Sequence, residues 1–190
     1  MGFELCQQRP RNAAATRGAI LEAANLRFVA ESYDQVGMRD IARDVGVDPA
    51  LISRYFGSKE DLFAAVLEDC GNGSDLMEGD RTTFGERIAH DVIYGPRKEF
   101  KLRWLLLMLR SIASPKAAEI IMRQSNARFY QPFTDWVGGD DAEIKARLTA
   151  GLIMGLTVSR DISGGFNLSE EQCERLNIRL AAMLQSLIDD

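Results

Sequence analysis

Residues 37–57 limit the possible fold more than any other stretch, because they predict two short helices joined by a tight turn. The first helix, over about residues 38–45, carries an apolar stripe on one face. Gly46 is suited to the left-handed conformation that ends a helix. Asp48 then offers a capping oxygen, and Pro49 fits the first position of a second helix.

The second of these helices has two different faces. Ile52 and Phe56, one turn apart, point toward a core. The opposite face is small and polar and consists of Pro49, Ala50, Ser53 and Arg54, with Tyr55 beside them. Such a face suits insertion into a DNA major groove. An ordinary corner between two helices of a helical protein is the alternative that the spacing leaves open.

Three motifs follow one another at fixed separations in the first third of the chain: Ile20-Leu21-x-Ala23-Ala24-x3-Phe28, Asp40-Ile41-Ala42-x3-Gly46-Val47 and Tyr55-Phe56-x-Ser58-Lys59-x2-Leu62. In this order, the stretch from Thr16 to Leu67 resembles the DNA-binding domain of the tetracycline-repressor (TetR) family of bacterial transcriptional regulators. The sequence departs from the family at Ser53, where members usually carry a tyrosine that contacts phosphate.

The resemblance implies roles for individual residues at a double-stranded DNA operator. Pro49 and Ala50 are expected near base edges, where either can contact a thymine methyl group, and Arg39 is expected to contact guanine through two hydrogen bonds. Phosphate contacts are expected from Ser53, Arg54, Tyr55 and Lys59, and from Thr16 and Arg17 near the start of the first long helix.

The distribution of charge agrees with DNA binding at one end only. The net charge of −5 argues against a general nucleic-acid binder. Residues 1–60, however, hold eight Lys/Arg and eight Asp/Glu, so the acidic excess lies entirely in the rest of the chain. We therefore expect a neutral head with local basic spots on an acidic body.

The hydrophobic pattern predicts an all-α protein, because apolar and β-branched residues never alternate as they do in strands. A three-helix helix-turn-helix domain over residues 1–70 is followed by a helical bundle over residues 71–190. The boundary is placed at Gly71–Asp75. Further helices are predicted over 81–94, 98–113, 115–137, 140–160 and 169–188. The helix over 98–113 is apolar nearly all round and is expected to be the buried centre of the bundle.

The C-terminal domain supplies aromatic and sulfur-containing side chains with a few polar tips, which together can form an apolar cavity. The family resemblance implies that a small-molecule effector binds there. The expected pocket residues are Phe84, Ile88, His90, Trp104, Met108, Phe129, Tyr130 and Phe133. The alternative is that these residues simply form the core.

Two consecutive helices near the C-terminus predict a homodimer. Small residues recur along the first, and apolar residues recur at spacings of three and four along the second. The expected interface consists of Leu148, Gly151, Leu152, Gly155 and Ser159 with Leu176, Leu180, Met183 and Leu187. Packing within one chain is the alternative.

Other classes of protein find little support in the sequence. A single histidine and no HExxH or clustered cysteine argue against a metal site, and no cofactor is expected. No G-x-S-x-G elbow is present, so no catalytic residue is assigned and an enzyme is not expected. Cys6, Cys70 and Cys173 are odd in number and far apart, which favours reduced thiols in a cytoplasmic protein. The longest apolar run, Trp104–Leu109, is too short to span a bilayer, so no membrane partner is expected.

The sequence therefore predicts a cytoplasmic, homodimeric regulator of transcription. We expect a repressor that an apolar or amphipathic effector releases from a palindromic operator. An activator of the same fold, a small all-helical enzyme and a protein–protein adaptor are the alternatives.

Overall fold

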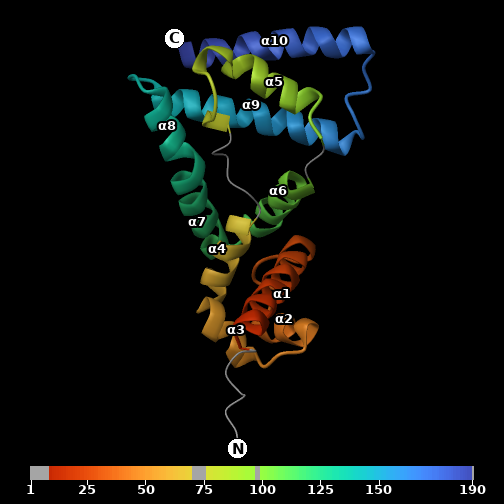
Figure 1. Ribbon diagram of the computed structural model, residues 1–190, viewed down its shortest axis with the longest axis vertical. Helices are drawn as coiled ribbons and strands as arrows, with labels where there is room; N and C mark the ends of the chain where they lie inside the picture. The colour runs from red at the N-terminus through yellow and green to blue at the C-terminus, as the bar shows by residue number, and fades with distance from the viewer. Residues whose placement is uncertain (1–8, 70–75, 97–98, 190) are drawn as a thin grey trace, which may run out of the picture. The chain divides into compact units, whose positions relative to one another are not determined.

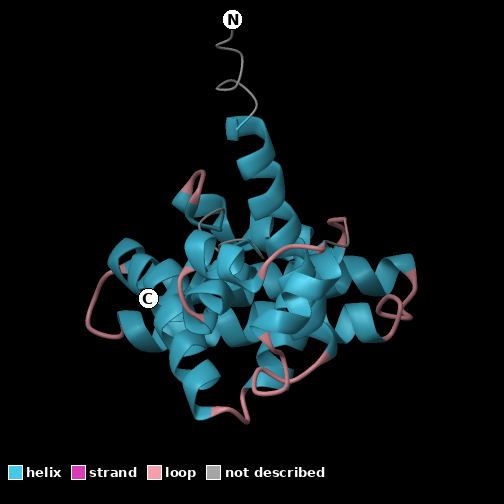
Figure 2. Ribbon diagram, turned by 90° about the horizontal axis from the view of Figure 1, so that it is seen from below, coloured by secondary structure: helices cyan, strands magenta, loops and turns pink. Residues whose placement is uncertain are grey.

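The computed structural model describes residues 9–69, 76–96 and 99–189. Helices and connecting loops make up this described part, which contains no strand (Figure 2), so the predicted all-α class is confirmed. The elements are α1 (Arg9–Ala30), α2 (Met38–Val45), α3 (Pro49–Phe56), α4 (Lys59–Asp69), η2 (Arg81–Thr83), α5 (Phe84–Ile93), α6 (Glu99–Ser111), α7 (Pro115–Ser125), η3 (Asn126–Tyr130), α8 (Gln131–Val137), α9 (Ala142–Ile162) and α10 (Glu170–Asp189) (Figure 1).

The chain forms two compact units. The first comprises residues 1–71 and 103–124, and the second comprises residues 72–102 and 125–190. The predicted boundary after residue 70 divides the chain by expected function, whereas the two units are defined by contacts. That boundary stays a prediction. The residues at which it was placed, Gly71–Asp75, lie outside the described part of the chain.

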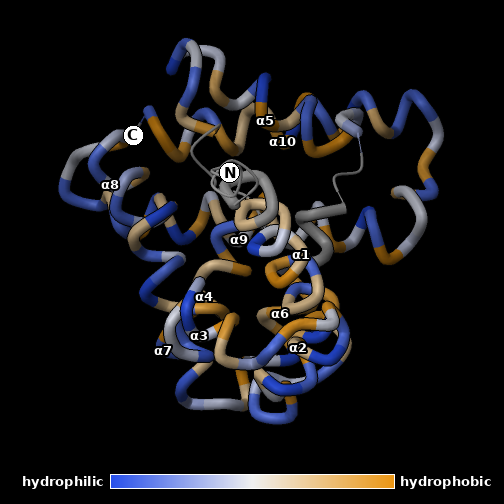
Figure 3. Tube along the Cα trace, turned by 60° about the horizontal axis from the view of Figure 1, so that its bottom comes forward, coloured by the Kyte–Doolittle hydropathy of each residue, from blue (hydrophilic) through white to orange (hydrophobic). Residues whose placement is uncertain are grey.

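The first unit is built around the aromatic side chains of Phe28, Tyr33 and Phe63. The ring of Phe63 meets each of the other two edge to face, with centroids 4.9 Å apart in both pairs. Ile20, Ile41 and Leu62 complete this core from α1, α2 and α4 and are fully buried. Figure 3 shows apolar stretches of the trace where α1, α4 and α6 come together.

The second unit is a bundle in which α10 lies along α5 and α9 (Figure 1). Its core contains the buried side chains of Phe84, Phe133, Leu180 and Leu184. The backbones of α5 and α10 approach closely at Gly85, whose N–H donates a hydrogen bond of 2.9 Å to Oε1 of Gln185. A side chain at Gly85 would collide with the backbone of α10.

One expectation about the helices needs correction. The helix over 98–113 is not a buried centre: Leu109 is 60% exposed, and Leu107 is buried in the core of the first unit. Its residue Leu102 lies outside the described side chains. The helix predicted over 115–137 is formed as a continuous helical stretch of α7, a π-helical turn at Asn126–Tyr130 and α8. No described helix combines the length and the apolar character needed to cross a membrane.

Candidate DNA-binding surface

The turn between α2 and α3 forms as the sequence predicts. Gly46 adopts a left-handed conformation with φ 75° and donates its N–H to the carbonyls of Ala42 and Arg43, which closes α2. The carboxylate of Asp48 accepts a hydrogen bond of 2.7 Å from the N–H of Ala50 and caps α3. Pro49 occupies the first turn of α3, where no donor is needed.

Opposite faces of α3 have opposite environments. Ile52 and Phe56 are buried in the core of the first unit, which fixes the rotation of the helix about its axis. Four residues expected to meet DNA are exposed on the other side: Pro49, Ala50, Ser53 and Arg54. Tyr55 is half-buried and packs against the core, so its ring supports α3 as well as flanking this face.

Three more predicted DNA contacts come from the neighbouring helices α1 and α2. Arg39 is exposed in the first turn of α2. The guanidinium carbon of Arg17 lies 4.6 Å from the centroid of the Phe56 ring, which anchors this exposed arginine of α1 to α3. Thr16 is half-buried one residue before it. The fold therefore joins α1 to the helix expected to enter the groove.

Lys59 begins α4 and has a partner that the sequence did not predict. Its ammonium nitrogen lies 4.3 Å from the centroid of the Tyr33 ring. Partial burial lowers the pKa of Lys59, although the carboxylates of Asp34 and Glu60 oppose this change. A capping box starts the helix beside it: Asp61 accepts hydrogen bonds from the N–H and hydroxyl of Ser58, and its own N–H donates to that hydroxyl.

Polar contacts fasten the turn between α6 and α7 to this part of the first unit. The ammonium of Lys116 donates a hydrogen bond of 2.7 Å to Oε1 of Glu60. The hydroxyl of Ser114 donates one of 2.9 Å to the carboxylate of Asp34. Because these acceptors flank Lys59 and Tyr33, the turn holds the start of α4 in place. No sequence motif indicated these long-range pairs.

An arginine joins α1 to α2 on the same unit. Arg27 donates through Nη2 to Oδ1 of Asp44 at 2.9 Å and through Nε to Oδ2 of the same carboxylate. It also forms an ion pair of 3.1 Å with Glu31. The hydrogen bonds from Arg27 lower the pKa of Asp44. This bidentate contact fixes the orientation of α2 relative to α1, and with it the position of Arg39.

The residues expected to line an effector pocket fall into different environments. Phe84, Ile88 and Phe133 are buried in the core of the second unit, and Phe129 and Tyr130 pack partly buried against it. Trp104 packs against the core of the first unit, Met108 is half-buried on α6, and His90 is exposed on α5. The fold thus brings together five of the eight residues in and against the core of the second unit.

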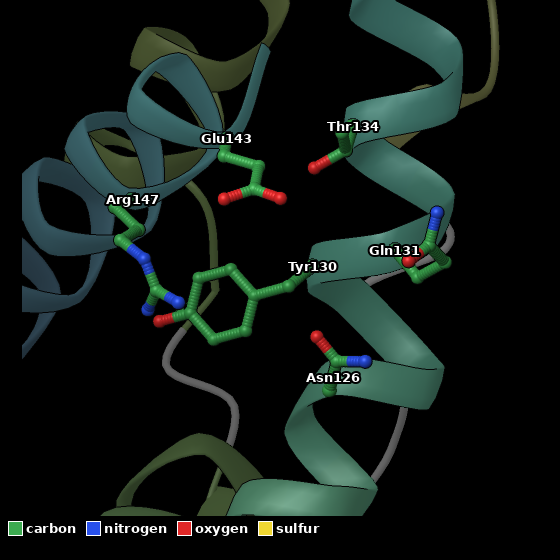
Figure 4. A pocket seen from close by; sticks show the side chains of 6 residues that line it. All are labelled: Asn126, Tyr130, Gln131, Thr134, Glu143 and Arg147. Atoms are coloured by element: carbon green, nitrogen blue, oxygen red, sulfur yellow. The ribbon is translucent and has the colours of Figure 1, made fainter. Parts of the chain in front are cut away.

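A polar hollow lies in the second unit where α9 faces η3 and α8 (Figure 4). Its volume is about 100 Å³, and Tyr130 is the member of the expected pocket that lines it. The other lining residues are Asn126, Gln131, Thr134, Glu143 and Arg147. Ligand pockets for drug-sized molecules occupy about 300–1,000 Å³, so this hollow admits only a much smaller molecule.

The predicted dimer residues are mostly at the surface. Leu148 on α9 and Met183 on α10 are each 53% exposed, and Gly151, Gly155 and Ser159 are exposed as well. Leu152, Leu176 and Leu187 are half-buried, whereas Leu180 is buried in the core and is not available to a partner. The sequence reasoning missed Ile144 and Ile162, which extend the exposed stripe of α9 in both directions.

The described side chains show no arrangement suited to holding a metal ion, since no group of three or more potential ligands gathers among them. Cys173 is a free thiol, and Cys6 and Cys70 lie outside the described residues.

Comparison with protein families gives two matches that together span most of the chain. Residues 20–66 match the family described as bacterial regulatory proteins, tetR family. Residues 82–188 match the domain described as tetracyclin repressor-like, C-terminal domain. No curated protein sequence gives a significant match.

Solved structures share this fold at low sequence identity. NalD of Pseudomonas aeruginosa, described as the secondary repressor of the MexAB-OprM multidrug efflux pump, superposes with a TM-score of 0.65 at 23% identity, over 88% of this chain and 95% of NalD. GusR of Salmonella enterica superposes with a TM-score of 0.65 at 21% identity, over 97% of this chain and 99% of GusR. A TetR-family regulator from Streptomyces coelicolor gives 0.56 at 22% identity, over 96% and 99%.

Proposed function

Because this chain belongs to the tetR family of bacterial regulatory proteins, we propose that it regulates transcription by inserting α3 into the major groove of an operator. The observation that supports this most strongly is the exposed face of Pro49, Ala50, Ser53 and Arg54, held outward by the burial of Ile52 and Phe56. Small side chains on this face allow the helix backbone to approach base edges closely.

The residues around α3 have different roles in DNA recognition. Arg39 forms two hydrogen bonds to a guanine, a contact worth about 1–3 kcal/mol of discrimination. Ala50 or the ring of Pro49 contacts a thymine methyl group. Phosphate contacts come from Ser53, Arg54, Tyr55, Lys59, Thr16 and Arg17, and set the register of the protein on the duplex rather than its sequence preference.

The active form is a homodimer in which α9 and α10 of two subunits form a four-helix contact. Support comes from the exposed apolar and small residues of α9: Ile144, Leu148, Gly151, Gly155, Ser159 and Ile162. A Cβ atom added at Gly151 or Gly155 would have no atom from another part of the chain within 4 Å. The chain itself therefore leaves room for a partner helix. Two-fold symmetry requires operator half-sites about 34–36 Å apart, or multiples of that distance.

We further propose that the protein is a cytoplasmic repressor released by an apolar or amphipathic effector. NalD, which shares the fold, is described as a repressor. The aromatic cluster of Phe84, Phe129, Phe133 and Trp136 offers apolar surface for such a molecule once the rings separate. The effector must bind the two states of the protein with different affinity, and a coupling of about 1–3 kcal/mol suffices.

The test is selection of binding sites from a random double-stranded DNA library by the full chain. We expect a palindrome with half-sites one helical turn or a multiple of a turn apart, bound with an affinity that falls steeply as salt rises. Arg39→Ala should weaken binding to the selected site and relax the preference at one base pair per half-site. Arg39→Lys should keep the charge and still lose that preference.

Arg175→Ala is the matched control, because it removes an equally exposed arginine from α10. Selection of no enriched sequence, or an equal loss of binding in Arg39→Ala and Arg175→Ala, would contradict the proposed function.

A further inference from the structure

We propose that the polar hollow between η3, α8 and α9 binds a small zwitterion, a molecule that carries one carboxylate and one ammonium group. Arg147 binds the carboxylate and Glu143 binds the ammonium group. This site is separate from the aromatic cluster proposed for an apolar effector, and its occupancy does not depend on whether the protein binds DNA.

The two charges lie on one face of α9, because positions 143 and 147 are four residues apart, about one turn of helix. A glutamate and an arginine at this spacing ordinarily pair with each other. Here no ion pair joins them, nor does any other described residue form an ion pair with either side chain. Two opposite charges therefore face the same hollow with their hydrogen-bonding groups available.

The ring of Tyr130 explains why Arg147 does not turn toward Glu143. The guanidinium carbon lies 4.9 Å from the ring centroid, so the arginine is held by a cation–π contact (Figure 4). A cation–π contact uses none of the N–H groups of the guanidinium as hydrogen-bond donors, and these groups can match a carboxylate with two parallel hydrogen bonds. Tyr130 thus positions Arg147 without neutralising it.

The π-helical turn places the remaining polar groups. A π-helical turn within an α-helix often marks a functional site. The segment Asn126–Tyr130 widens the helix between α7 and α8 and lets Asn126 line the same hollow as Thr134 (Figure 4). The amide and the hydroxyl supply both donors and acceptors, so a zwitterion can satisfy its remaining hydrogen bonds there.

The size of the hollow restricts the ligand further. A volume of about 100 Å³ is well below the roughly 300–1,000 Å³ of pockets that take drug-sized ligands. An amino acid as small as glycine has the required size and carries both charges close together. The side chain of a large amino acid such as tryptophan exceeds this space.

The experiment is an NMR titration of the full-length protein, labelled with ¹⁵N, at neutral pH. The probes are glycine, acetate, methylammonium and tryptophan. We expect glycine to shift the amide signals of Asn126, Tyr130, Glu143 and Arg147 to saturation. Acetate and methylammonium, which each offer one charge, should bind roughly tenfold more weakly, the ratio expected for the loss of a charged hydrogen bond. Tryptophan should not compete with glycine.

Glu143→Gln and Arg147→Met should each weaken glycine binding by a similar roughly tenfold ratio. The matched controls are Glu171→Gln and Arg175→Met, an exposed pair at the same spacing on α10, which should leave glycine binding unchanged. Absence of saturable shifts, equal binding of acetate and glycine, or equal losses in the control pair would overturn the proposal.

Discussion

The ammonium nitrogen of Lys59 lies 4.3 Å from the centroid of the Tyr33 ring, in the unit that carries α3. Burial raises the pKa of Tyr33 to about 12, with a smaller contribution from Glu60, and lowers the pKa of Lys59. The lysine is thus partly desolvated before any phosphate reaches it. In the proposed complex, a phosphate compensates the ammonium group for the water that burial has removed.

Lys59→Met should therefore weaken operator binding without unfolding the protein, because a methionine retains the apolar packing over Tyr33. Loss of one phosphate contact per subunit should reduce the slope of log K against log salt by about 0.9 for each contact. The slope can be measured by fluorescence anisotropy between low and moderate salt. An unchanged slope would show that Lys59 stays with Tyr33 and does not reach the DNA backbone.

Acid should destabilise the contact between Glu60 and Lys116. The hydrogen bond from Lys116 is the largest cause of the lowered pKa of Glu60, whose ordinary value is 4.5. A lowered carboxylate pKa adds stability above pH 4.5 that is lost as the pH falls through the folded value. Urea unfolding from pH 3 to 7 should show a smaller acid loss in Lys116→Met than in the wild type, with Lys116→Arg close to wild type. Identical pH profiles for all three proteins would contradict this.

Gly85 should tolerate no side chain. An added Cβ would lie 2.1 Å from the carbonyl oxygen of Ala181, a backbone atom that cannot move away cheaply. Gly85→Ala should lower the free energy of unfolding by at least about 1–3 kcal/mol, measured by chemical denaturation. Gly18→Ala, at a helical site with no atom within 4 Å, should instead raise stability by about 0.5–1 kcal/mol. Similar effects of the two substitutions would argue against the close approach of α5 and α10.

Gly155→Glu should separate the proposed dimer while leaving each subunit folded. A carboxylate in the centre of a four-helix contact is a buried unpaired charge, which costs about 3–5 kcal/mol and so weakens association roughly hundredfold or more. Sedimentation equilibrium measures the association, and circular dichroism checks the helix content. Gly18→Glu is the control on α1. A Gly155→Glu protein that remains dimeric would place the interface elsewhere.

The sequence predicts best those features that depend on neighbouring residues. Gly46 and Asp48 fix the turn between α2 and α3 through their own backbone and carboxylate, and the Ser58–Asp61 box starts α4 in the same way. Ser169 and Gln172 form a similar box at the start of α10, with hydrogen bonds of 2.8 and 3.2 Å. Local hydrogen bonds of this kind need no knowledge of the tertiary structure.

Features that depend on packing between distant elements could not be predicted. The periodicity of α10 placed Leu180 at a dimer interface, yet its side chain is buried against α5 and α9 within one chain. An apolar stripe does not indicate whether a helix of the same chain or of a partner subunit covers it. The spacing of Glu143 and Arg147 is that of an ordinary i, i+4 ion pair on a helix, and only the three-dimensional structure places Arg147 over the ring of Tyr130 instead.

Operator binding by Ala50→Glu tests most directly the proposal that the exposed face of α3 enters the groove. The substitution puts a carboxylate on that face without touching the core, and Ala113→Glu puts one on an exposed site in the turn after α6. Fluorescence anisotropy with the selected operator should give binding at least roughly hundredfold weaker for Ala50→Glu, since like charges brought together cost several kcal/mol. Ala113→Glu should bind like the wild type. Wild-type affinity in a folded Ala50→Glu protein would contradict the account.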